Sequence, residues 1–160
     1  MRESLAGNRY AKSLITLSIE KNELDVIYQD MILISETIEN SKDLSVLLNS
    51  PVVKTDKKQE ILKTIFGENT TELTKQFLLL ISSRNREALI GDIANAFVRQ
   101  YKVIKQIIVT EITSAVKLDA AQKKKILQLL NTDETSSVEV IEKINPEIIG
   151  GFIVRVDDKQ

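Results

Sequence analysis

The stretch TELTKQFLLLISSRNREAL (Thr71–Leu89) decides how the first part of the chain folds. Its threonines are suitable residues to begin a helix, since a hydroxyl can accept a hydrogen bond from a backbone N–H group of the first turn. We therefore expect a helix that begins at Thr70 or Thr71 and ends at Ser82 or Ser83. Apolar residues surround it, with one face made of Leu73, Phe77, Leu80 and Ile81 and the other carrying Leu78 and Leu79. A helix that is apolar all round lies either at the centre of a core or between its own core and an external partner.

The helix predicted near the N-terminus has the same character. It contains RYAKSL (Arg9–Leu14), and helical periodicity brings together Tyr10, Leu14 and Leu17, with Ala11, Ile15 and Ile19 beside them. That arc is wider than the ~100° stripe that a surface helix normally buries. Two interpretations stay open: the helix is wedged between two others, or part of the arc is left for a partner helix. A groove between these two helices would suit an amphipathic helix from another protein.

The periodicity of apolar residues predicts six helices before residue 105. Their expected ranges are Ser4–Lys21, Glu23–Asn40, Lys42–Leu48, Thr55 or Asp56 to Phe66, Thr70 or Thr71 to Ser82 or Ser83, and Asn85–Lys105. Pro51 stops the third helix, Thr55 or Asp56 is expected to cap the fourth, and Gly67 to end it in the left-handed conformation. Because the loops are short, residues 1–105 are predicted to form an antiparallel six-helix bundle.

The pattern changes after residue 105 to that of a small α/β unit over residues 106–160. Strands are predicted at Ile107–Val116, Ser137–Ile144 and Gly151–Val156, and a helix at Asp119–Leu130. On the first strand, β-branched residues recur on one face, at Ile108, Thr110, Ile112 and Val116. The predicted fold class is therefore mainly α, with a helical bundle followed by a smaller α/β unit.

The composition excludes several chemistries. Among 160 residues there is no Cys, His or Trp, and the aromatic content is 4%. Thiol nucleophiles, imidazole bases and the common zinc ligand sets are therefore excluded, and no cofactor or metal is expected. The net charge of −1 gives no general attraction to nucleic acid. The first ten residues lack the apolar core of a signal peptide, and no apolar run is long enough to cross a bilayer, so a soluble cytoplasmic protein is expected.

A few charged residues could serve a partner. Lys123–Lys125 and the pair Lys57 and Lys58 are interpreted mainly as solvated helix faces. Arg84 and Arg86 lie at a junction between two helices, where they could cap the carbonyl groups of the preceding helix or meet a carboxylate of a partner, and the cap is favoured.

In their order and spacing, six segments resemble the delta subunit of F-type ATP synthase, which is called the oligomycin sensitivity-conferring protein in mitochondria. The segments are RYAKSL (Arg9–Leu14), NSPVV (Asn49–Val53), KKQEILKTIF (Lys57–Phe66), FLLLISSRNREAL (Phe77–Leu89), TSAVKLDAAQ (Thr113–Gln122) and NPEIIGGFIVRVDDK (Asn145–Lys159). The resemblance implies a non-catalytic stator connector that joins the alpha subunits of the catalytic head to the b-subunit peripheral stalk. It also implies a peripheral location on the cytoplasmic face of a bacterial inner membrane.

The same resemblance implies where the partners bind. The N-terminal helix of an alpha subunit would occupy a groove between the first and fifth helices, and the second unit would contact the C-terminal region of the b subunits. One wall would be Tyr10, Ala11, Leu14 and Leu17, the other Leu73, Phe77, Leu80 and Ile81, with Tyr28 at the rim. No nucleic acid and no membrane insertion are expected, and the isolated protein is expected to be a monomer.

Members of that family continue with a final helix, and this sequence ends at Gln160, before the position of that helix, so we expect a second unit without it. We therefore expect apolar surface to be exposed on the second unit. Three alternatives stay open: a generic helical adaptor for an unrelated amphipathic helix, a nucleic-acid-binding protein that uses Lys123–Lys125, and an enzyme with a ligand in a pocket between helices.

Overall fold

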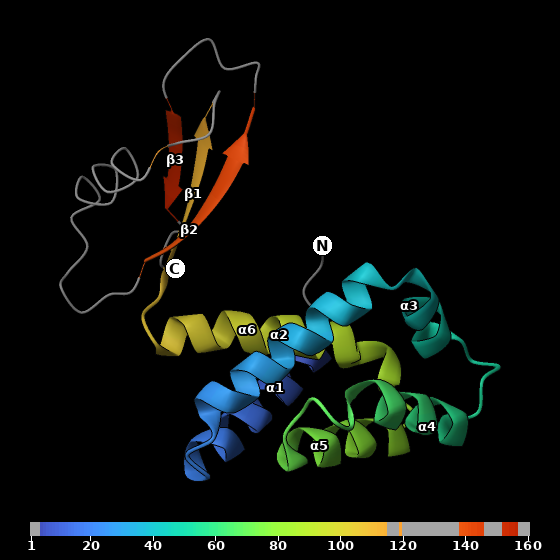
Figure 1. Ribbon diagram of the computed structural model, residues 1–160. Coiled ribbons are helices and arrows are strands. Elements are labelled where there is room, and N and C mark those ends of the chain that lie inside the picture. The colour runs from blue at the N-terminus through green and yellow to red at the C-terminus, as the bar shows by residue number, and fades with distance from the viewer. Residues whose placement is uncertain (1–3, 115–118, 120–137, 146–151, 157–160) are drawn as a thin grey trace. The chain divides into compact units, whose positions relative to one another are not determined.

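The computed structural model describes residues 4–114, 119, 138–145 and 152–156 (Figure 1). The chain divides into two compact units between Tyr101 and Lys102, in the last turn of the sixth helix. The first unit is helical and the second contains a small sheet. The helix expected over Asp119–Leu130, including Lys123–Lys125, lies outside the described residues except for Asp119.

Six α-helices form the first part of the described chain, as predicted. They are α1 (Leu5–Glu20), α2 (Leu24–Asn40), α3 (Lys42–Asn49), α4 (Thr55–Phe66), α5 (Glu72–Ser83) and α6 (Ile90–Ile104). The expected start of the last helix at Asn85 is wrong, because Asn85 has a left-handed φ of 54°. A 3₁₀ turn, η1 (Glu87–Leu89), precedes α6 instead. A tight turn joins α1 to α2, and α3 lies at the opposite end of α2 (Figure 1).

Side chains cap three of the helix N-termini. Ser4 and Ser41 each accept a hydrogen bond from a backbone N–H group of their own helix. Thr71 does the same for α5, as predicted, and is itself held by α2: its backbone N–H and its hydroxyl both donate to Oδ2 of buried Asp30, at 2.8 and 2.7 Å. Asp30 thus fixes the start of α5 with a charge-assisted pair of hydrogen bonds.

The predictions for the two ends of α4 were wrong. Lys54, rather than Thr55 or Asp56, precedes the helix, and no side chain caps it. The Thr55 hydroxyl donates instead to the side-chain oxygen of Asn85, at 2.7 Å. Gly67 ends the helix with φ −62°, so it is not left-handed. A Cβ at this position would lie 2.3 Å from the carbonyl oxygen of Lys63, and this close approach accounts for the glycine.

The core of the first unit draws on every α-helix. Its deeply buried apolar residues include Ala11 and Leu14 from α1, Ile27, Met31 and Ile34 from α2, Leu48 from α3, Leu62 and Phe66 from α4, Ile81 from α5, and Ile93 and Phe97 from α6. Helix α1 approaches α6 closely at Gly7, where an added Cβ would lie 3.2 Å from Cβ of Asp92.

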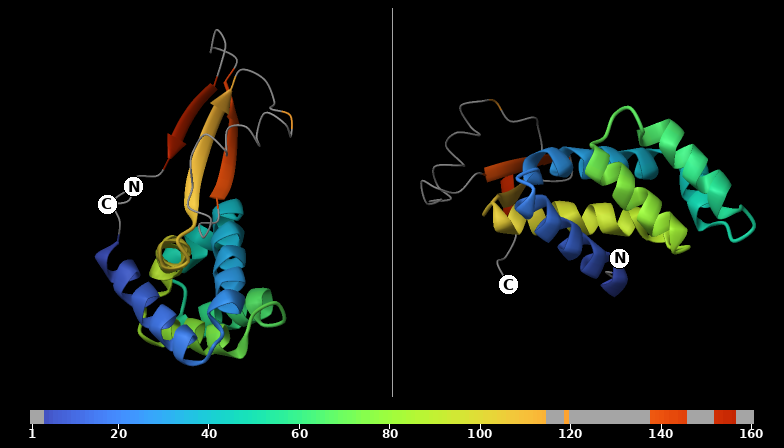
Figure 2. Two further views of the ribbon diagram at one scale, coloured as in Figure 1. Left: turned by 90° about the vertical axis from the view of Figure 1, so that its left-hand side faces the viewer. Right: turned by 90° about the horizontal axis from the view of Figure 1, so that it is seen from below.

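The described part of the second unit is a three-stranded sheet in the order β2-β1-β3 (Figure 2). The strands are β1 (Ile108–Ser114), β2 (Val138–Ile144) and β3 (Phe152–Val156), close to the predicted ranges. Strand β1 is central, parallel to β2 and antiparallel to β3. Thr110 and Ile112, which were predicted to share one face of this strand, are both fully buried.

Two tyrosines join α2 to α6. The rings of Tyr28 and Tyr101 stack with centroids 3.8 Å apart and planes 12° from parallel. The hydroxyl of Tyr101 donates to Oδ1 of Asp25 at 2.7 Å. Burial and the hydrogen bond to Asp25 raise the pKa of Tyr101 to about 12 from an ordinary value of 10.0.

This shift predicts a loss of stability in alkali. Above pH 10 the unfolded chain loses the Tyr101 proton while the folded chain still holds it, so the free energy of unfolding falls as the pH rises towards 12. Urea unfolding of wild type and Tyr101→Phe from pH 8 to 12 measures the effect. The stability lost over this range should be smaller in Tyr101→Phe, and equal losses in both proteins would contradict the assignment.

Candidate partner-binding surface

Helix α1 divides its wide apolar arc between the core and the surface. Ala11 and Leu14 are buried, with exposed fractions of 0% and 1%. Tyr10 is half-buried, and Leu17 is exposed. The family resemblance placed these four residues on one wall, but of the four only Tyr10 and Leu17 have exposed surface in this structure.

Helix α5 is divided in the same way. Leu73 and Ile81 are buried, whereas Phe77 is half-buried and Leu80 is 49% exposed. Leu78, expected on the opposite side, is also buried. The apolar residues of α5 therefore lie in three places. Some face the core and some face solvent. Leu79 lines a cavity of about 230 Å³ between α5 and α4.

The four predicted wall residues with open surface are Tyr10, Leu17, Phe77 and Leu80, and we call them the apolar strip. Ala11, Leu14, Leu73 and Ile81 support the two helices from the core. Tyr28, expected at the rim, is packed against Tyr101 of α6. The binding role of all nine residues stays a prediction.

Arg86 joins the strip at Tyr10. Its Nη1 donates to the hydroxyl oxygen of Tyr10 at 2.6 Å, and its guanidinium carbon lies 5.6 Å from the centroid of the Tyr10 ring. This distance is within the range of a cation–π contact. Sequence reasoning favoured Arg84 and Arg86 as caps of the carbonyl groups of the preceding helix. Their backbone N–H groups do donate to the carbonyl oxygen of Ile81, at 3.2 and 3.1 Å, whereas the Arg86 guanidinium binds a side chain of α1. No local pattern reveals this contact, because the two residues lie on different helices.

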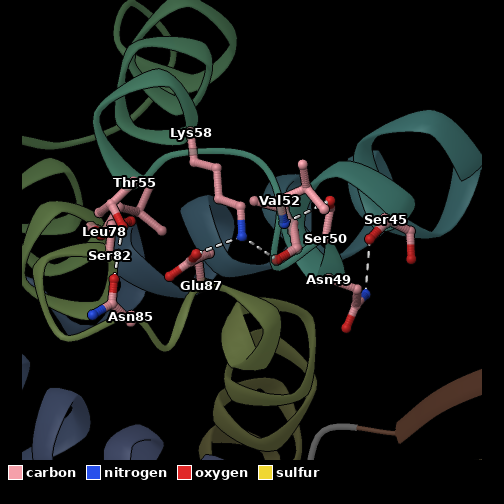
Figure 3. A network of polar contacts seen from close by, with 11 residues as sticks. Ser45, Asn49, Ser50, Val52, Thr55, Lys58, Leu78, Ser82, Asn85 and Glu87 are labelled. Atoms are coloured by element: carbon pink, nitrogen blue, oxygen red, sulfur yellow. Dashed lines mark hydrogen bonds and ion pairs between the residues drawn. The ribbon is translucent and has the colours of Figure 1, made fainter.

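A buried ion pair fixes the segment that carries Arg86. Nζ of Lys58, in α4, lies 2.6 Å from Oε1 of Glu87, and the two side chains are 5% and 6% exposed. The same ammonium group donates to the carbonyl oxygen of Leu48 at the end of α3, at 3.0 Å. Figure 3 shows the Lys58 side chain pointing to Glu87, with the hydrogen bond between Thr55 and Asn85 nearby. The prediction that Lys58 is solvated was wrong, whereas its neighbour Lys57 is exposed.

The described ranges offer no group of three or more acidic residues arranged to hold a metal ion. In those same ranges, every helix is too short or too polar to cross a membrane.

The described chain is thus a mainly helical protein that carries exposed apolar side chains on α1 and α5, with a second, smaller unit that contains a sheet. Residues 6–160 match the family model described as ATP synthase delta (OSCP) subunit. The chain belongs to this family.

Bacterial relatives agree with this assignment, and a solved structure shares the fold. ATP synthase subunit delta of Cytophaga hutchinsonii is 34% identical over 160 residues, which cover 100% of this chain and 87% of the relative. The Flavobacterium psychrophilum subunit is 32% identical over 160 residues, covering 100% and 90%. A chain of the Toxoplasma gondii mitochondrial ATP synthase hexamer shares the fold, with a TM-score of 0.69 and 23% identity over 95% of this chain and 86% of that chain.

The Lys58–Glu87 pair gives a test of how the surface is supported. Lys58→Met should lower the free energy of unfolding by about 3–5 kcal/mol, because it leaves the Glu87 carboxylate buried without a counter-charge. Lys57→Met, which removes an exposed charge next to it, should change stability by less than about 0.5 kcal/mol. Urea unfolding measures both variants.

The double variant Lys58→Met/Glu87→Leu separates the charge from the packing. It should recover most of the lost stability, since neither charge is then buried alone. Equal stability of Lys58→Met and Lys57→Met would contradict a structural role for the pair.

Proposed function

We propose that this chain is a non-catalytic stator connector of an F-type ATP synthase. It links the alpha subunits of the catalytic head to the b-subunit peripheral stalk and resists the torque of the rotor. Membership of the delta subunit family supports the proposal, and the apolar strip is the structural observation that carries it.

The apolar strip receives the N-terminal helix of an alpha subunit. Leu17 and Leu80 are large apolar side chains that are 38% and 49% exposed, and the half-buried rings of Tyr10 and Phe77 lie on the same two helices. An amphipathic helix laid on such a surface buries on the order of 1,600 Å² in total, a standard size for a specific interface. A few aromatic anchors would supply most of the affinity, with Tyr10 and Phe77 the natural candidates.

The division of the chain into two units suits a connector, because each unit can bind a different partner. The helices of the first unit form an antiparallel bundle, supported by the short turns between successive helices. The second unit faces the C-terminal region of the b subunits. The protein acts at the cytoplasmic face of a bacterial inner membrane, and its family membership with bacterial relatives supports this location.

Calorimetric titration with the N-terminal peptide of the cognate alpha subunit tests the proposal. We expect saturable one-to-one binding with a negative heat-capacity change, which is the mark of apolar burial. A scrambled peptide of the same composition is the control. Equal binding of both peptides would favour a generic adaptor, and failure to bind the cognate peptide by a protein shown to be folded would overturn the proposal.

A pair of substitutions on α5 tests the strip itself. Leu80→Glu should weaken peptide binding by at least about 30-fold, because it places an uncompensated charge in the interface. Since Leu80 is 49% exposed, the thermal unfolding of the Leu80→Glu variant should stay close to that of wild type. Leu78→Glu is the matched control: Leu78 is 4% exposed, so this variant should unfold. An unfolded Leu80→Glu variant would mean that Leu80 belongs to the core.

A further inference from the structure

We propose that Arg86 and Tyr10 form a receptor for a carboxylate group of the partner helix. The inference rests on the proposed function, and it adds a charged recognition point to the apolar strip. The ligand chemistry is an Asp or Glu side chain, or a terminal carboxylate, carried by a helix that lies on α1 and α5.

The Arg86 guanidinium has capacity for such a ligand. A guanidinium group presents five N–H donors in a fixed plane, and the contact with Tyr10 uses one nitrogen, Nη1. Within the described ranges Arg86 makes no ion pair with a carboxylate, and it is exposed. The plane matches the two oxygens of a carboxylate, so a bidentate pair can form without breaking the contact with Tyr10.

The guanidinium is also held in place before any partner binds. The backbone N–H of Arg86 donates to the carbonyl oxygen of Ile81 at 3.1 Å, and its own carbonyl oxygen accepts from Leu89 at 2.9 Å. The next residue, Glu87, is anchored inside by Lys58. The Tyr10 ring and hydroxyl then restrict the side chain itself. A pre-ordered donor loses less conformational entropy on binding, which raises the affinity for a matching acceptor.

The surroundings favour a peptide carboxylate over a phosphate backbone. Leu17, an exposed apolar residue, lies two helical turns further along the same side of α1 as Tyr10. One further exposed arginine, Arg84, is close in sequence, but the whole chain has a net charge of −1. Binding to a nucleic-acid backbone depends on many cations acting together. A single ordered guanidinium beside an apolar strip matches an amphipathic helix with one acidic residue at the edge of its apolar face.

A double-mutant cycle tests the receptor. Wild type and Arg86→Gln are each titrated by calorimetry with the N-terminal peptide of the cognate alpha subunit. Each is also titrated with a copy in which every Asp and Glu is replaced by Asn and Gln and the C-terminus is amidated. Wild type should bind the neutral copy about tenfold more weakly than the acidic peptide, whereas Arg86→Gln should bind the two within about twofold of each other.

Three further variants identify the group responsible. Arg86→Lys keeps the charge but loses the planar fork, so it should recover only part of the preference. Tyr10→Phe removes the acceptor hydroxyl and should reduce the preference while the ring contact stays. Lys12→Gln is the matched control: it removes one positive charge from an exposed position two residues along α1, on the opposite side from Tyr10, and should leave the preference unchanged. The preference should also shrink between 0.05 and 0.5 M NaCl, as screening requires.

The outcomes separate this inference from the function on which it rests. If wild type and Arg86→Gln show the same preference for the acidic peptide, Arg86 is only a structural link to α1 and the receptor is overturned, while the connector is not. If neither peptide binds to folded wild type, the proposed function fails and the receptor fails with it. If DNA of random sequence binds and competes with the acidic peptide, the site recognises phosphate, and the carboxylate receptor is overturned.

Discussion

The buried contact between Lys58 and Glu87 is the constraint on which the arrangement of the helical unit depends. An ammonium and a carboxylate group removed from water cost several kcal/mol each in solvation, and only close, well-directed contacts offset that cost. Lys58 has two such contacts, with Glu87 and with the carbonyl oxygen of Leu48. The three residues come from α4, from η1 and from the end of α3. The pair therefore fixes the register of segments that local periodicity alone would leave free to slide.

One oxygen of the Glu87 carboxylate lacks a hydrogen bond within the described part of the chain, which limits how much the ion pair can add to the stability of the fold. That oxygen, Oε2, is buried and has no hydrogen-bond partner among the residues that the structure describes. Replacement of a buried ion pair by apolar residues of similar volume is often neutral or stabilising. The pair thus contributes to the definition of a single arrangement more than to total stability, and the arrangement it defines holds the turn between α5 and α6 where Arg86 lies.

For the described residues, periodicity in the sequence was sufficient to predict the helices and strands apart from the start of α6, but not which side of an all-apolar helix lies inside. Leu80 and Ile81 are adjacent and chemically alike, yet one is 49% exposed and the other fully buried. Their difference is set by where α5 lies among the other helices, which no local pattern contains. The same limit explains the errors at Lys58 and Thr55, and why the contact of the Arg86 guanidinium was not predicted. Each of these side chains has its partner on a distant segment, at Glu87, Asn85 and Tyr10, where local capping and solvation rules do not apply.

The division of each apolar arc between core and surface has a consequence for a stator connector. Tyr10 and Leu17 lie on the helix that Ala11 and Leu14 anchor in the core. A partner helix bound to the strip would therefore contact side chains of a helix that is held by close packing on its other side. A ligand that binds only the folded state adds RT ln(1 + [L]/Kd) to the free energy of unfolding. On the proposed function, the attached alpha subunit would therefore stabilise the very helices that hold it. A connector under fluctuating load gains from this coupling, because local opening of α1 or α5 would then require the partner to be released first.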